Sequence, residues 1–521
     1  MLRIFRSPRA DFERDAELAD EVYDDRALAA LADSGFNAVW VRVIYRRLLP
    51  NPRYPAFGQD AEKGLPALNR VVERGARHGI GLVVYCQEPF GLAQDDPFWE
   101  EHPEMAGVPS DYDFGTAGKP FRMRALCASA AATRTFLEVS SEQLLRRVPG
   151  IRGVITITAS EFMSHCFSHY ATASKADPKR PSLDCPRCRE RTGSEVAAEV
   201  LNCMRRGLDA ADPEVPLIAW NWSWYIHEPD PQPGILARLA PGIHLQADFE
   251  RGDTKVDPTG RSIEINEYSL SYAGPSARFR RTREAALERG RRVYAKLQLS
   301  TTHELATVSN IPLVGRLCDK AAAFRDLDLA GYMGCWNFGN ELTLNTRAFN
   351  YFLSPDCPRD REAALRQVAR DAFPGCDAGK VTAAWEHFGG AFDYYPFSIP
   401  FLYHSPLNYA LALLVEPGPV RAQRLGRSWL MDPRCGDDDP APSFGPFTPE
   451  EIAERLGTMA RLWAEGLPEY RQIAREELAV LDDALEVYEA DPRQGFHGEA
   501  HDYMVTPALI RRKQEALRGR V

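Results

Sequence analysis

Short apolar segments alternate with longer amphipathic segments over roughly the first two thirds of the chain. The apolar segments are rich in Val, Ile and Trp, and the segments between them carry Leu and Ala at helical spacing. Eight of the apolar segments predict β-strands, of which the third is the weakest. They span residues 35–43, 79–89, 123–129, 153–160, 216–224, 242–250, 292–300 and 331–338.

This alternation predicts an α/β protein whose first domain is a (β/α)8 TIM barrel. Near-continuous apolar strands are typical of a parallel sheet covered by helices, and eight strand–helix units in roughly 300 residues fit a barrel. A doubly wound open sheet is the main alternative. It is disfavoured because no glycine-rich phosphate turn follows the first predicted strand, and because chemically useful residues follow many strands.

The pattern changes near residue 350. Long segments with helical periodicity predict a helical C-terminal domain over residues 349–521, following a barrel domain over residues 1–348. Both acidic and basic side chains occur along these helices, as on solvated faces. A Cys-containing loop insertion in the barrel is predicted over residues 162–192.

Composition narrows the class of protein only slightly. The formal net charge is −10 over 521 residues, and an acidic chain is not expected to bind nucleic acid in general. No window approaches 18 uninterrupted apolar residues, so no membrane span is expected. Because the N-terminal segment lacks the apolar core of a signal peptide, we expect a cytoplasmic protein. A homo-oligomer is left open.

Carboxylates follow several predicted strands, and the carboxyl ends of parallel barrel strands form the rim on which active sites are built. Glu161 follows the clearest strand and is predicted to be a general acid. Asp248 and Glu304, after the sixth and seventh predicted strands, are alternatives for a second catalytic carboxylate. Glycoside hydrolysis requires two such groups around one glycosidic bond.

Aromatic and polar residues near the same strand ends are candidates for binding sugar. A Trp ring suits the apolar face of a pyranose, although strand alternation places at least one Trp of residues 219–225 in the core. The candidates are Arg42, Glu88, Asn221, Trp222, Trp224, Trp336, Asn337 and Tyr403.

A group of cysteines predicts a structural zinc site. Cys185 and Cys188 form a C-x-x-C motif, Cys166 precedes them at a spacing typical of zinc loops, and His169 lies between. A metal would stabilise a loop that has few apolar residues. A reduced thiol pair and a redox dithiol are alternatives. No organic cofactor is expected.

The order of these segments resembles barrel glycoside hydrolases related to family 20 β-hexosaminidases and α-glucuronidases. The resemblance rests on "GFNAVWVRV", "HGIGLVVYCQEP", "LCAS" and "GVITITASE". It implies that Glu161 is the general acid, because a glutamate ending strand four has that role in the family. The hexosaminidases place an aspartate just before it to orient an acetamido group, whereas this chain has Ser160.

The same resemblance extends to the rest of the chain. The α-glucuronidases draw base candidates from later strand ends, where this chain has Asp248 and Glu304, and they carry a helical C-terminal domain. We therefore expect a glycoside hydrolase that is exo-acting on small oligosaccharides or glycosides. A non-catalytic carbohydrate-binding barrel and a non-glycosidic lyase or zinc-dependent hydrolase are the alternatives.

Overall fold

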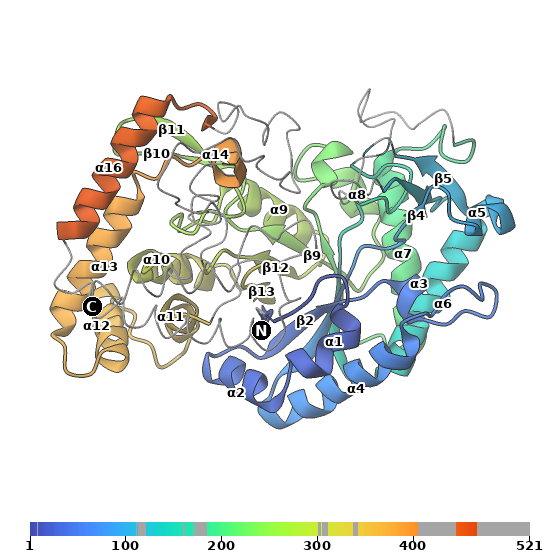
Figure 1. Cartoon of the computed structure of the whole chain (residues 1–521), viewed down its shortest axis with the longest axis horizontal. Coiled ribbons are helices and arrows are strands. Elements are labelled where there is room, and N and C mark those ends of the chain that lie inside the picture. The colour runs from blue at the N-terminus through green and yellow to red at the C-terminus, as the bar shows by residue number, and fades with distance from the viewer. Residues whose placement is uncertain are drawn as a thin grey trace, which may run out of the picture.

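Eight parallel strands close into a barrel that is surrounded by helices (Figure 1). The structure is a computed structural model, and it describes residues 1–7, 9–110, 112, 121–159, 162–169, 171, 185–300, 304, 311–336, 342–404 and 444–465. The barrel strands are β1 (Leu2–Phe5), β2 (Ala38–Arg42), β3 (Gly81–Cys86), β7 (Ile151–Thr156), β8 (Leu217–Trp220), β9 (Ile243–Asp248), β12 (Val293–Lys296) and β13 (Gly331–Met333). The predicted (β/α)8 fold is confirmed.

Two of the predicted strand positions need correction. The first barrel strand is β1, which the hydrophobic pattern does not reveal because it has only four residues, two of them partly exposed. The segment 123–129 does not enter the barrel. Its residues form β6 (Met123–Leu126), which pairs with β4 (Leu92–Ala93) and β5 (Ala106–Pro109) in a separate antiparallel sheet. Because the two errors offset each other, β7 is still the fourth barrel strand.

Nine helices within the described residues accompany the barrel strands. Figure 1 shows the first of them in blue below β2. They are α1 (Asp15–Val22), α2 (Asp25–Asp33), α4 (Ala61–His78), α6 (Ala131–Arg147), α7 (Gly193–Ala211), α8 (Pro233–Arg238), α9 (Ala277–Leu287), α10 (Val314–Arg325) and α11 (Leu344–Phe352). Shorter elements at the connections are α3 (Tyr45–Leu48), α5 (Phe98–Glu101), two 3-10 turns (Pro103–Met105 and Trp224–Ile226) and the hairpin of β10 (Asp253–Val256) and β11 (Ser262–Ile265).

Local sequence explains where the longer helices begin and how closely they pack. Helix α7 begins with a capping box, in which the Thr192 hydroxyl accepts from the Glu195 amide and the Glu195 carboxylate accepts from the Thr192 amide. At Gly207 on the same helix, a Cβ atom would lie 2.0 Å from the Glu138 carbonyl oxygen of α6. The absence of a side chain there lets α6 and α7 approach each other closely.

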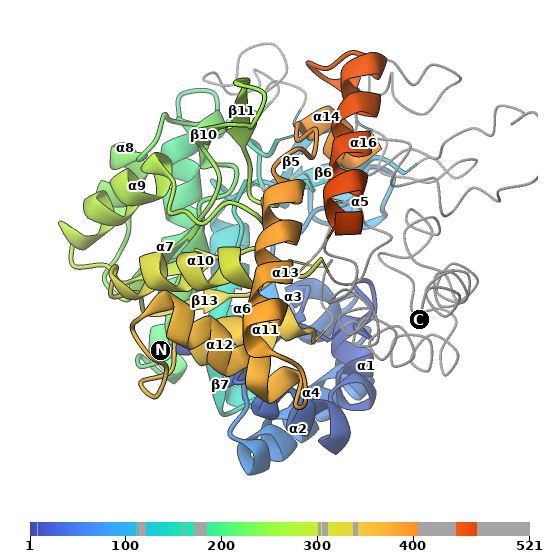
Figure 2. The same cartoon turned by 90° about the vertical axis from the view of Figure 1, so that its left-hand side faces the viewer.

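Four described helices follow the barrel, in the region predicted to be a helical domain. They are α12 (Arg361–Ala372), α13 (Ala378–Phe392), α14 (Ile399–His404) and α16 (Pro449–Glu465). Helices α12 and α13 pack on α10 of the barrel, and Figure 2 shows α13 and α16 side by side. The boundary at residue 348 stays a prediction. None of the described helices has the length and apolar character needed to cross a membrane.

A buried ion pair joins the first two barrel strands to α1. The Arg6 Nη1 atom lies 2.6 Å from Asp15 Oδ2, which also accepts from the Arg42 backbone amide at 2.6 Å. Both side chains of the pair are at most 2% exposed. The Arg6 and Asp15 charges are therefore buried together, and each serves as the counter-ion of the other.

We expect Asp15→Ala to lower the free energy of unfolding by about 3–5 kcal/mol, because it leaves the Arg6 guanidinium buried without its counter-ion. Denaturant unfolding followed by circular dichroism measures the loss. The matched control is Arg366→Ala, which breaks the exposed Arg366–Glu362 pair and should change stability by at most about 0.5 kcal/mol. Equal effects of the two variants would contradict this account.

Candidate functional site

Asp248 ends β9, the sixth barrel strand, and its side chain is fully buried at the carboxyl rim. The indole N–H of Trp220, at the end of β8, donates to Asp248 Oδ1 at 2.9 Å. The guanidinium groups of Arg251 and Arg278 lie 3.6 and 3.7 Å from Oδ2. That second oxygen accepts no hydrogen bond from any other described residue.

A second carboxylate, Glu267, faces the same arginine. The Trp222 indole N–H donates to Glu267 Oε1 at 2.9 Å, and Arg251 Nε lies 3.8 Å from Oε2. One guanidinium therefore contacts both carboxylates, Asp248 through Nη1 and Glu267 through Nε. Glu267 reaches this position because the β10–β11 hairpin is inserted between β9 and α9.

The two carboxyl groups differ in proton affinity. Burial raises the pKa of Asp248, and the nearby charge of Glu267 raises it further, while Arg251 and Arg278 offset only part of this. Burial would also raise the pKa of Glu267, but Arg251, the Trp222 hydrogen bond and Lys296 together hold that pKa below its usual value. Two neighbouring acids whose environments separate their pKa values are typical of functional sites.

Lys296 ends β12 and is completely buried beside this pair. Its Nζ atom donates to the Glu267 backbone carbonyl, lies 3.3 Å from Gln298 Oε1, and stands 4.4 Å from the centre of the Tyr268 ring. It therefore fixes the backbone of the segment that carries Glu267. Its positive charge also acts to lower the pKa of both carboxyl groups, although burial keeps the pKa of Asp248 raised.

An aromatic layer lies beneath the rim. The Trp336 ring stacks on Trp40 with centroids 5.2 Å apart and contacts Tyr85 and Trp220 edge-on at 4.9 and 5.1 Å. These rings come from β2, β3, β8 and the residues after β13. Trp336 is 8% exposed. The predicted sugar contact is thus mainly a packing residue.

The tryptophans after β8 have different environments. Trp222 is partly exposed, and Tyr225 beside it is 43% exposed, so both can meet a ligand. Trp224, which we expected to bind sugar, is instead buried with its indole N–H bonded to Thr158 Oγ1 at 2.9 Å. Asn221 is also buried, and its amide nitrogen lies 3.4 Å from Gln232 Oε1.

Arg42 and Glu88, expected as sugar contacts, are buried in interactions within the protein. The Arg42 guanidinium donates to the Phe12 carbonyl at 3.0 Å and stacks 4.1 Å from the centre of its ring. The Glu88 carboxylate accepts from the backbone amides of Tyr45 at 2.6 Å and Phe90 at 3.0 Å. These contacts fit structural roles, because both side chains are buried and bonded to neighbouring backbone groups.

Glu304, the other candidate for a second carboxylate, is fully buried. Its Oε1 atom accepts from the Leu270 amide at 2.7 Å. The contact holds the chain three residues after Glu267, which fits a structural role. Between the two candidates, Asp248 is the one found at a strand end.

Three predicted residues cannot be placed. Glu161 and Asn337 lie outside the described residues. The Tyr403 backbone belongs to α14, but its side chain is also outside the described part of the structure. Their roles stay predictions from the sequence.

The predicted zinc ligands Cys166, Cys185 and Cys188 lie together, and the fourth member of their group is Cys127. His169, which we expected in this set, is not part of the group, because Cys127, directly after β6, takes the fourth place. Four thiolates fill a tetrahedral zinc site and leave no position for a reactive water. The group therefore gives no support to the alternative of a zinc-dependent hydrolase.

Four residues of these sites were not predicted from the sequence: Glu267, Arg251, Lys296 and Cys127. Glu267 lies 19 residues beyond Asp248, past a hairpin whose turn signal "DPTG" is visible in the sequence. Lys296 is a charged residue inside an apolar strand. Burying a charge without a partner is energetically costly, so a lysine at such a position indicates a buried partner. Cys127 lies in a segment predicted to be a barrel strand, so the prediction separates it from the cysteines of the loop.

Comparisons with known proteins give a likeness of fold. No protein-family model and no curated protein matches the sequence. Solved structures that match include a GH138 enzyme targeting pectin rhamnogalacturonan II, with a TM-score of 0.49 and 8% identity over 95% of this chain and 61% of that one. The α-L-fucosidase isoenzyme 2 of Paenibacillus thiaminolyticus gives 0.39 and 13% over 72% of this chain and 50% of that one.

The α-amylase of Geobacillus thermoleovorans also matches, with a TM-score of 0.36 and 11% identity over 64% of this chain and 69% of that one. These three matching structures are barrel glycoside hydrolases. The chain spans about 61% of the length of the GH138 enzyme. Likeness at this level carries no argument about substrate or catalytic residues.

Burial raises the pKa of Glu88 from 4.5 to about 7, with its two backbone hydrogen bonds opposing the shift. Between pH 4.5 and about 7, the Glu88 carboxyl group is therefore protonated in the folded state and ionised in the unfolded state. We expect the stability of the wild type, relative to Glu88→Gln, to fall as the pH rises from about 4.5 to 7 and to change little above that range. Urea unfolding of both proteins across this range measures the difference, and a difference independent of pH would contradict the shift.

Proposed function

We propose that this chain is a glycoside hydrolase whose reaction takes place at the carboxyl rim of the barrel. The observation that carries the proposal is Asp248, a buried carboxyl group at a strand end with a raised pKa and one oxygen that accepts no hydrogen bond from the described residues. Such a group in a barrel rim is a candidate for proton transfer or nucleophilic attack, because a raised pKa makes its ionised carboxylate a stronger base and nucleophile.

Glu161 is the proposed partner of Asp248 and acts as the general acid. It follows β7, the fourth strand, in the sequence. In the proposed reaction, the Glu161 carboxyl group gives its proton to the glycosidic oxygen as the bond to the anomeric carbon breaks. The Asp248 carboxylate either takes a proton from the attacking water or bonds to the anomeric carbon before water releases the sugar.

Glu267 and Arg251 are proposed to position Asp248 and to set its charge. Arg251 contacts both carboxylates, and the Glu267 charge keeps the pKa of Asp248 raised. The partly exposed rings of Trp222 and Tyr225 stand beside Arg251, whose guanidinium lies 6.0 and 5.0 Å from their centres. They are the proposed stacking surface for a pyranose.

Exo-action on small oligosaccharides or glycosides belongs to the same proposal, as does the relation to family 20 β-hexosaminidases and α-glucuronidases. Ser160 stands where the hexosaminidases have the aspartate that orients the acetamido group. We therefore propose a mechanism in which Asp248, and not a neighbouring group of the substrate, supplies the second function.

The test is a screen of aryl N-acetylhexosaminides, galactosides and glucuronides, with the anomer of the first product followed by NMR. We expect Asp248→Asn and Glu161→Gln each to lower kcat by about 10²- to 10⁴-fold, and the control Glu142→Gln, on the outer helix α6, to leave it unchanged. Azide should restore turnover of Asp248→Gly, because it replaces the missing base or nucleophile. Full activity of Asp248→Asn on a substrate cleaved by the wild type would contradict the proposal.

A second variant tests the coupling between the carboxylates. Glu267→Gln removes a negative charge that raises the pKa of Asp248, whereas Arg251, Arg278 and Lys296 remain. If Asp248 must be ionised to react, the acidic limb of the kcat profile should move to lower pH in this variant. A limb that stays in place would show that Glu267 does not act through Asp248.

A further inference from the structure

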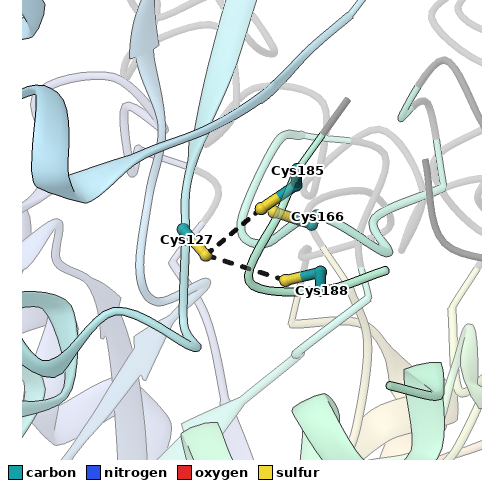
Figure 3. Close-up of side chains that lie close together, drawn as sticks. All are labelled: Cys127, Cys166, Cys185 and Cys188. Atoms are coloured by element: carbon teal, nitrogen blue, oxygen red, sulfur yellow. Dashed lines mark hydrogen bonds between the residues drawn. The ribbon is translucent and has the colours of Figure 1, made fainter. Parts of the chain in front are cut away.

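Four cysteine sulfurs converge at one buried point outside the proposed catalytic site (Figure 3). The Sγ atoms of Cys127, Cys166, Cys185 and Cys188 all lie within 4.8 Å of one another, and each residue is at most 2% exposed. The Cys127 sulfur is 3.6 Å from those of Cys185 and Cys188. Side chains from three separate parts of the chain therefore point toward a common centre.

These separations fit a tetrahedron of thiolates around one metal ion. With zinc–sulfur bonds of about 2.3 Å, the edge of a regular tetrahedron is about 3.8 Å. A disulfide would require about 2.05 Å, and all four cysteines are free. An iron–sulfur cluster would hold its thiolates farther apart, since each one binds a different iron atom.

Backbone hydrogen bonds fix the positions of the four cysteines. The Cys127 amide donates to the Met105 carbonyl at 2.8 Å, which ties it to the 3-10 turn just before β5. In the C-x-x-C turn, the Cys188 and Arg189 amides both donate to the Cys185 carbonyl, at 3.0 and 3.1 Å. This turn brings Cys185 and Cys188 to the same side of the chain just before α7.

The surroundings favour negative charge on the sulfurs and leave room for them. The Ser129 hydroxyl lies 3.3 Å from the Cys188 sulfur and accepts a 2.7 Å hydrogen bond from Arg191, so its own hydrogen can point to the sulfur. At Gly107, a Cβ atom would lie 2.9 Å from the Cys166 sulfur and 2.8 Å from the Ala125 carbonyl oxygen. The glycine keeps this space open for the thiolate.

We propose that Cys127, Cys166, Cys185 and Cys188 bind one structural Zn²⁺ ion. The ion ties the end of β6 to the loop after β7 and to the turn that leads into α7. Four thiolates complete the coordination of the metal, so the site supplies stability and no catalysis. This proposal is independent of the proposed hydrolase function.

The first experiment is elemental analysis of the full chain purified without added metal. We expect one zinc ion per chain in the wild type and its loss in Cys127→Ser. Two controls should keep the ion: Cys376→Ser, which removes a partly exposed cysteine outside the group, and His169→Ala, which separates this ligand set from one that includes the histidine. Zinc retained by Cys127→Ser and lost from His169→Ala would overturn the ligand set.

The second experiment uses the wild type, because a cysteine variant that does not fold would not show which residues bind the metal. Replacement of the bound metal by Co²⁺ should give the intense visible bands of a tetrahedral four-thiolate site, and a chelator should lower the Tm. No bound metal, with a Tm that does not respond to the chelator, would overturn the proposal. Iron as the only metal found would overturn the assignment to zinc.

Discussion

The pairing of β13 with β1 closes the barrel, and the arrangement of every rim residue depends on that closure. Leu2 aligns with Gly331 and Ile4 with Met333, so a three-residue strand and a four-residue strand complete the circle. Closure brings the carboxyl ends of all eight strands to one edge and removes their interior side chains from water. A carboxyl group placed there, such as Asp248, must obtain its stabilisation from protein dipoles and charges, and its raised pKa follows from that burial.

Glu267 reaches the rim because it follows an inserted hairpin. The β10–β11 hairpin follows β9, and Glu267 comes directly after it. The hairpin is bound to helix α16, because Asp257 pairs with Arg455 at 2.5 Å and Arg261 with Glu451 at 2.8 Å. Helix α16 therefore supports the hairpin that precedes Glu267.

The cysteine group includes Cys166 from the segment after β7, the segment that carries the proposed acid in the sequence. Cys166 follows Glu161 by five residues in the sequence. Between them, the Met163 carbonyl accepts at 2.7 Å from the amide of Gly91, which directly precedes β4. A metal that fixes Cys166 would restrict the loop after β7 at a point close in sequence to the proposed acid. A bound metal can order a loop that has few apolar residues, as a hydrophobic core does elsewhere in the protein.

Sequence periodicity predicted the barrel because seven of its strands are apolar segments flanked by helices. It failed at β1, where four residues are too few to show a period, and at β6, where an apolar segment belongs to another sheet. Asp248 was predictable because it ends a strand. Glu267 and Cys127 were not, since each joins its partners through tertiary contacts with segments far away in the sequence, and no local pattern encodes such contacts. The buried environments of Arg42, Glu88 and Trp224 were missed for the same reason.

The central claim is that sugar binds at the carboxyl rim against Asp248, and a crystal structure of Asp248→Asn with a glycoside cleaved by the wild type tests it most directly. The account predicts the sugar ring beside Trp222, with its anomeric carbon facing residue 248 and Trp336 beneath it. A glycoside bound elsewhere on the barrel, or at the rim with its anomeric carbon turned away from residue 248, would contradict the account.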